Sequence, residues 1–142
     1  MGHVKPMSHV SQPAPEARAL TRQEEAARYA PYQALLEKLA ELDAYSHTIM
    51  LQWPKAEKHL LCAQVRETLL RMRRHTAVAW KRKQKASALF DLDVEIEVLR
   101  HLIRKAFEMR YINAHRLEVW TRHVSEIGRM VGAWIKHAGA AP

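Results

Sequence analysis

Seven lysine and arginine side chains and one histidine crowd into residues 71–85, whose sequence is RMRRHTAVAWKRKQK. Guanidinium and ammonium groups at this density suit contacts with phosphate groups or with an acidic protein surface. The residues predicted to make these contacts are Arg71, Arg73, Arg74, His75, Lys81, Arg82, Lys83 and Lys85.

If this segment is helical, part of its charge falls close to one helix face. The residues predicted to share that face are Arg71, Arg74, His75, Arg82 and Lys85. The other cations surround the C-terminal end, where positive charge also complements the helix dipole. Two interpretations stay open, a solvated helix end matched to the dipole or a binding surface for a polyanion or an acidic protein. No zinc-finger spacing or helix-turn-helix pattern is present, so base-specific readout is not predicted.

The charge distribution favours the binding surface. Residues 54–86 hold ten lysines and arginines against two glutamates, an excess that equals the net charge of +8 for the whole chain. Positive and negative residues nearly cancel elsewhere. A localised basic surface with a polyanionic or acidic partner is therefore predicted.

Catalytic and metal chemistry find little support in the sequence. A glycine-rich phosphate loop and a nucleophile elbow are both missing, and no two histidines have the i, i+4 spacing of a metal-binding helix. The carboxylates Asp91, Asp93, Glu95 and Glu97 are interpreted as the acidic start of a helix, matched to its dipole. We therefore predict that the protein is not an enzyme and holds no metal and no cofactor.

The composition is that of one globular domain. The chain has 142 residues, of which 48% are hydrophobic. Its single cysteine, Cys62, excludes an internal disulfide framework and is predicted to be a small buried hydrophobe. Without an 18-residue apolar run or a secretory signal, a cytoplasmic protein with no membrane segment is predicted.

Four amphipathic helices must position the basic segment, because apolar residues recur at spacings of three, four or seven in four successive segments. The stripes are Leu35, Leu39, Leu42, Ile49 and Trp53; Leu61, Val65, Thr68, Met72 and Ala79; Leu89, Leu92, Ile96, Leu99, Ile103, Ala106 and Met109; and Leu117, Trp120, Val124, Ile127, Val131 and Trp134. The four tryptophans are assigned to the core or to a subunit interface rather than to base stacking.

The breaks between these stripes complete the predicted fold. Pro31 is expected to open the first helix and Pro54 the second, and Asn113 marks a break before the fourth. We predict an all-α, antiparallel up-down four-helix bundle over residues 29–138. Residues 1–28 are predicted to be a mobile arm with a short helix at residues 16–29, and residues 139–142 a C-terminal tail.

Two glycines interrupt the last helical pattern, in the segment EIGRMVGAWIK at residues 126–136. A glycine inside a helix costs about 1 kcal/mol relative to alanine, so Gly128 and Gly132 call for a reason. At this spacing they share one helix face, and the pair is predicted to let another backbone approach closely.

The same segment resembles the C-terminal signature of the accessory variability determinant (Avd) proteins of diversity-generating retroelements. These proteins form part of a wider four-helix-bundle family that includes the protein encoded within 23S rRNA intervening sequences. The junction Trp53, Pro54 and Lys55 and the leucine-rich sequence LDVEIEVLRHLIRKAFEMRYI also resemble the family, over residues 32–137 in all. The residues that match the signature are Ile127, Gly128, Arg129, Gly132, Trp134 and Ile135.

The resemblance implies a ring-like homopentamer with a positively charged surface. It also implies binding to a reverse transcriptase and to template RNA, with DNA as a second candidate, in support of mutagenic cDNA synthesis but without catalysis. The glycine segment would then serve helix or subunit packing, and the basic second helix would face the polymerase or the RNA. The alternative is a four-helix bundle that only self-assembles or binds another protein, without nucleic-acid binding.

Overall fold

The computed structural model describes residues 19–138, so the arm predicted for residues 1–18 and the tail at 139–142 lie outside the described residues. The chain divides into two compact units, Met1–Ala30 and Pro31–Pro142. The second unit holds the basic segment and the glycine pair.

Helix α2, Arg22–Met50, begins at a reciprocal cap. The Thr21 hydroxyl accepts a hydrogen bond from the Glu24 N–H at 3.1 Å, and the Glu24 carboxylate accepts one from the Thr21 N–H at 3.2 Å. Such a capping box satisfies N–H groups that a helix start otherwise leaves without partners. The prediction that Pro31 opens this helix was wrong, because the cap starts it earlier and Pro31 lies inside it.

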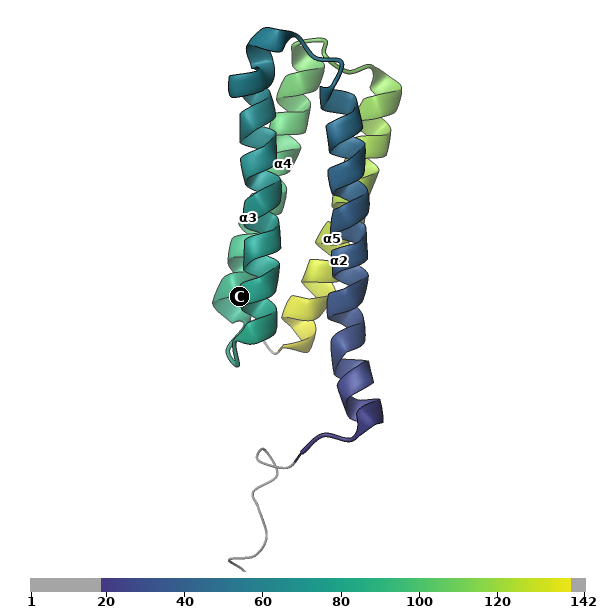
Figure 1. The fold of residues 1–142 in the computed structure, drawn as a ribbon, viewed down its shortest axis with the longest axis vertical. Helices are drawn as coiled ribbons and strands as arrows, with labels where there is room; N and C mark the ends of the chain where they lie inside the picture. The colour runs from purple at the N-terminus through teal and green to yellow at the C-terminus, as the bar shows by residue number, and fades with distance from the viewer. Residues whose placement is uncertain (1–18, 139–142) are drawn as a thin grey trace, which may run out of the picture. The chain divides into compact units, whose positions relative to one another are not determined.

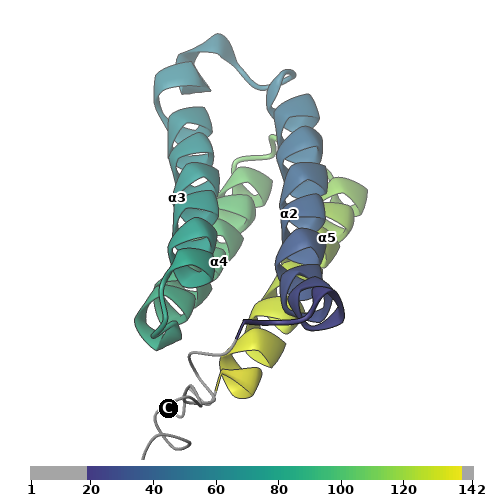
Figure 2. The same cartoon turned by 60° about the horizontal axis from the view of Figure 1, so that its bottom comes forward.

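The second unit, which takes in α2 from Pro31 onward, is a bundle of four helices (Figures 1 and 2). After α2 come the short 3₁₀ helix η3, Lys55–His59, and the helices α3, Leu61–Lys81, α4, Ala86–Glu108, and α5, Ala114–His137. The connections alternate between the two ends, so successive helices run antiparallel (Figure 1). No strand occurs within residues 19–138, and the predicted all-α helical bundle is confirmed.

The four apolar stripes meet in the bundle core. Leu42 of α2, Met72 of α3 and Trp120 of α5 are fully buried. The Trp120 indole N–H donates to the Ser46 hydroxyl at 2.9 Å, and Ser46 donates to the Leu42 carbonyl at 2.7 Å, so this polar pair is satisfied inside the core. The predicted burial of Cys62 is confirmed.

The tryptophans take packing positions, as predicted. Trp53 and Trp120 are buried, with ring centroids 6.0 Å apart. Trp80 and Trp134 are half-buried, and Tyr32 stacks on Trp80 with ring centroids 4.7 Å apart. Trp134 also packs against the core.

The junction between α2 and α3 differs from the prediction. Pro54 precedes η3, and α3 begins only at Leu61. The buried Glu57 carboxylate accepts the Leu61 N–H at 3.1 Å and the Tyr111 hydroxyl at 3.0 Å. One side chain therefore both caps α3 and joins it to the α4–α5 connection.

The carboxylates of α4 do not mark its start, and the dipole interpretation was wrong. The helix begins at Ala86 and its first turn has no acidic residue, because Asp91 already lies beyond it. Glu95 instead binds Arg71 of α3 at 2.8 Å. Glu97 binds Arg100 at 3.0 Å on its own helix, so these two carboxylates serve ion pairs.

The break before α5 lies where it was predicted. Asn113 is the N-cap, and its side chain accepts a hydrogen bond from the Arg116 N–H at 2.9 Å.

Within the described part of the chain, no helix combines the length and the apolar character needed to cross a membrane.

Candidate nucleic-acid interface

Helix α3 presents a basic outer side. Its core side is buried at Met72, Thr76 and Ala79, and the opposite side is exposed. We call the exposed cations of this side and of the loop that follows it the basic face of α3. Its members are Arg66, Arg74, Lys81, Arg82 and Lys83.

None of these five cations has an ion-pair partner among residues 19–138. Arg74 and Lys81 lie two turns apart on the helix, and Arg82 and Lys83 continue the charge into the loop before α4. Unpaired guanidinium and ammonium groups in a row can neutralise successive phosphates of a nucleic-acid backbone. The chemistry of the basic face is therefore suited to contact with a polyanion.

Two of the predicted binding residues are instead held within the bundle. Arg71 donates from Nε to the Glu95 carboxylate of α4 at 2.8 Å. Arg73 donates from Nε and Nη2 to one Asp43 oxygen of α2, at 3.1 and 2.7 Å. The two arginines thus lean to opposite flanks of α3 and tie it to its neighbours.

The Lys85 side chain binds backbone carbonyls at the end of α3 and does not add to the basic face. Its ammonium donates to the carbonyls of Ala79, Trp80 and Arg82 at 2.6, 3.2 and 2.9 Å. The last carbonyls of a helix have no partner within it, and a cation there also complements the dipole. Lys85 is therefore a C-terminal cap of α3.

The single face predicted from the sequence is not formed. Helix α3 ends at Lys81, so Arg82 and Lys85 lie beyond it, while Arg71 turns toward α4 and His75 is half-buried. Arg74, Lys81, Arg82 and Lys83 remain on the outer side. Sequence reasoning missed Arg66, although its spacing of eight and fifteen residues from Arg74 and Lys81 is that of one helix side.

The glycine pair of α5 does not admit a neighbouring backbone within the chain. A Cβ at Gly128 would lie 3.0 Å from the Arg100 guanidinium, a side chain of α4, and one at Gly132 would meet nothing within 4 Å. The predicted close backbone approach is therefore wrong for contacts within this chain. Around the pair, Ile127 is fully buried, Trp134 and Ile135 are half-buried, and Arg129 is exposed.

Comparison with known proteins gives the family. The family described as bAvd-like matches residues 34–138, about three quarters of the chain and nearly the whole bundle. No curated protein and no protein of known structure matches the chain significantly. The helical bundle and the sequence of α5 agree with this family match, which covers nearly the whole bundle. The chain belongs to the bAvd-like family, which points to an accessory, non-catalytic role in a diversity-generating retroelement.

Proposed function

We propose that this protein is a non-catalytic subunit that binds the reverse transcriptase and the template RNA of a diversity-generating retroelement, in the cytoplasm, in support of mutagenic cDNA synthesis. The observation that carries the proposal is the basic face of α3. Five exposed cations there have no acidic partner within residues 19–138, although carboxylates on α2 and α4 pair with the arginines beside them. Cations left unpaired in this way favour an external polyanion.

Membership of the bAvd-like family supports the same role. RNA is the expected ligand of the basic face, and DNA would meet the same phosphate chemistry. Because phosphate contacts carry no sequence information, binding should tolerate different sequences and weaken as salt rises.

We further propose that the subunit works as a ring-like homo-oligomer, a pentamer by its resemblance to Avd proteins. The supporting observation is an apolar row on the outer side of α4. Phe90, Val94 and Val98 follow one another at single-turn spacing and are 37%, 61% and 37% exposed. Exposed apolar rows of this kind are typical of protein–protein contacts. The mass of the particle in solution, measured by light scattering, tests this part.

Charge reversal of the basic face tests the binding. Arg74, Lys81, Arg82 and Lys83 are replaced together by glutamate, while Arg71, Arg73 and Lys85 stay because they hold the bundle. We expect this variant to lose both salt-sensitive RNA binding and co-purification with the reverse transcriptase. Its circular dichroism should stay helical, since none of the four side chains is buried.

A matched control carries the same change of charge elsewhere. Lys55, Lys58, Arg129 and Lys136 are also exposed and have no ion pair within the described residues. Their replacement by glutamate should leave most of the binding. Equal losses in the two variants would show that only net charge matters, and unchanged binding in the first would overturn the assignment of the basic face.

A further inference from the structure

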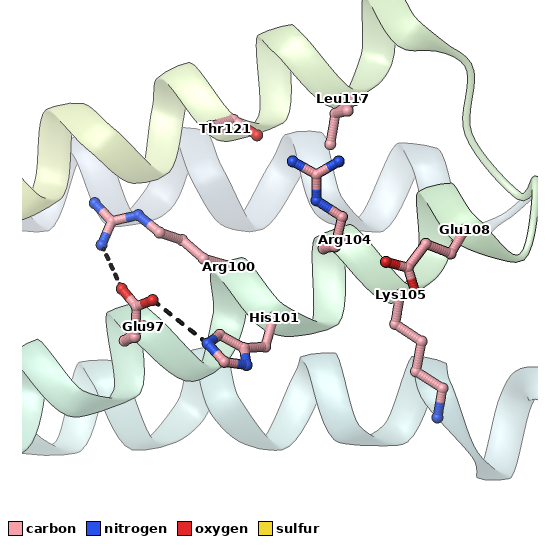
Figure 3. Close-up of a pocket in the computed structure, with 8 residues that line it drawn as sticks. All are labelled: Glu97, Arg100, His101, Arg104, Lys105, Glu108, Leu117 and Thr121. Atoms are coloured by element: carbon pink, nitrogen blue, oxygen red, sulfur yellow. Dashed lines mark hydrogen bonds and ion pairs between the residues drawn. The ribbon is translucent and has the colours of Figure 1, made fainter.

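A second cluster of cations lies in a groove between α4 and α5, apart from the basic face of α3 (Figure 3). The groove has a volume of about 690 Å³ and is open to solvent. Its lining residues are Glu97, Arg100, His101, Arg104, Lys105, Glu108, Leu117 and Thr121. The C-terminal half of α4 supplies the charged groups, and α5 supplies the leucine and threonine.

The acids of the groove leave two cations without partners. Glu97 is engaged by Arg100 at 3.0 Å and faces the His101 imidazole at 3.4 Å (Figure 3). Arg104 and Lys105 form no ion pair within residues 19–138. Glu108 lies one turn further along α4 and is the remaining acid of the lining. Even with both glutamates counted, the strong cations leave the groove positive.

The positions of these side chains suit two phosphates of one strand. The Arg104 side chain reaches toward Leu117 of α5 (Figure 3), and its guanidinium carbon lies 6.0 Å from the centre of the Phe107 ring. A planar guanidinium held there can bind one phosphate with two N–H groups, and the Lys105 ammonium, which points away from Arg104 (Figure 3), can add a point charge at another phosphate. Leu117 offers an apolar wall, and the Thr121 hydroxyl offers a further donor.

We propose that this α4–α5 groove is a phosphate-binding site for a single nucleic-acid strand. An open trough admits a continuing chain, whereas a free small ligand is usually held in a pocket that buries most of its surface. The inference rests on the proposed function for the identity of the strand, which is RNA. It adds a contact on α4 and α5, whereas the basic face lies on α3 and the loop that follows it.

The test compares two double variants with equal loss of charge. Arg104→Ala with Lys105→Ala removes the unpaired cations of the groove, while Arg122→Ala with Arg129→Ala removes two exposed cations of α5 that do not line it. The probe is an oligouridine of about ten nucleotides, within the range of site sizes for single-strand binders. Fluorescence anisotropy gives its affinity between about 50 and 200 mM salt.

We expect the groove variant to bind about tenfold more weakly, with a salt slope reduced by roughly 1.4 for two lost phosphate contacts. The control should change the affinity less than about twofold, because a distant exposed charge is largely screened at these salt concentrations. Circular dichroism must show that both variants are helical. Equal effects of the two variants would overturn the groove assignment, as would wild-type affinity in the groove variant.

A second measurement identifies the source of the phosphate. Addition of the oligouridine should shift the ¹⁵N resonance of the Arg104 side chain, and uridine triphosphate should do so only at much higher concentration. If the triphosphate binds as tightly as the oligomer, the strand assignment is overturned. Co-purification with the reverse transcriptase is measured for the groove variant as well as for the charge-reversal variant of the basic face. Loss of co-purification in the charge-reversal variant bears on the proposed function and not on the groove, so the two outcomes can be distinguished.

Discussion

Gly132 occupies a position in α5 where an alanine should fit. A Cβ built there meets no atom within 4 Å, and the residue lies inside a regular helix. Replacement by alanine should therefore stabilise the isolated chain by up to about 1 kcal/mol, the difference in helix propensity. Chemical denaturation measures this gain. If Gly132→Ala is instead neutral or destabilising, and the particle mass falls, the glycine serves a contact with another subunit.

Gly128 should respond less, because its space is partly taken. The Arg100 guanidinium lies 3.0 Å from the position of a new Cβ, and it is the far end of a flexible side chain that can move aside. The pair thus provides an internal comparison for the same substitution one helical turn apart.

Lys85 should matter for stability although it looks like part of a binding patch. Its ammonium donates three hydrogen bonds to carbonyls at the end of α3, which Lys85→Met would leave without these partners. We expect a loss of about 1.5–3 kcal/mol, the usual range for hydrogen bonds to a charged group. Lys81→Met, on the exposed outer side of the same helix, is the control and should change the stability little. Similar losses in the two variants would argue against the cap.

At the scale of elements, the sequence predicts what depends on local pattern. The strict apolar series of α5 and the cap at Asn113 both follow from spacing and from side-chain chemistry, and both are found. The end of α3 does not follow, because the charged run continues to Lys85 while the chain turns back at Lys81. That turn depends on contacts across space, which one sequence does not display.

The groove escaped the charge count for a related reason. Residues 87–113 nearly balance in charge as a block, but four of the five acids lie in the first half of α4 and the cations follow them. Averaging over the whole helix therefore conceals a basic end, with Arg100, Arg104 and Lys105 together on the half that lines the groove.

The junction around Glu57 is predicted to control the stability of several elements at once. Its carboxylate caps α3 and accepts the Tyr111 hydroxyl from the α4–α5 connection. Glu57→Ala removes both contacts and should cost about 1–3 kcal/mol, because it leaves the N–H of Leu61 with no hydrogen-bond partner. Lys58→Ala changes an exposed neighbour in the same 3₁₀ helix and serves as control. An equal effect of the two changes would contradict the role of the carboxylate.

At the scale of the whole molecule, structural and exposed cations are interleaved along one segment. Arg71, Arg73 and Lys85 hold helices together, whereas Arg74 and Lys81 face outward from between them. A dense basic run therefore performs two tasks. Reversing every cation in residues 71–85 would unfold the bundle as well as remove binding, and only the selective variant separates the two effects.

The folded chain should lose stability in alkaline solution. Burial raises the pKa of Cys62, Tyr45 and Tyr111 above their ordinary values of 9.0, 10.0 and 10.0. Hydrogen bonds to Glu41 and Glu126 raise the pKa of Lys38 above 10.5. In each case the folded state holds its proton more tightly than the unfolded state, so the unfolding free energy falls as pH rises. The stabilisation is complete below about pH 9 and disappears as pH passes through the raised values.

Urea denaturation at successive pH values between about 8 and 11 measures this slope. Tyr111→Phe removes one of the four groups and, after its own loss at neutral pH is subtracted, should show a shallower decline than the wild type. Burial is the largest cause of the raised pKa of Tyr111, and the Glu57 carboxylate is the next. Glu57→Gln should therefore also make the decline of stability with pH shallower, by a smaller amount. A stability that stays level or rises across this range would contradict the proposed proton linkage. If the decline is equally steep in the wild type and the Tyr111 variant, Tyr111 does not contribute to the proton linkage. Cys62, Tyr45 and Lys38 would then be its source.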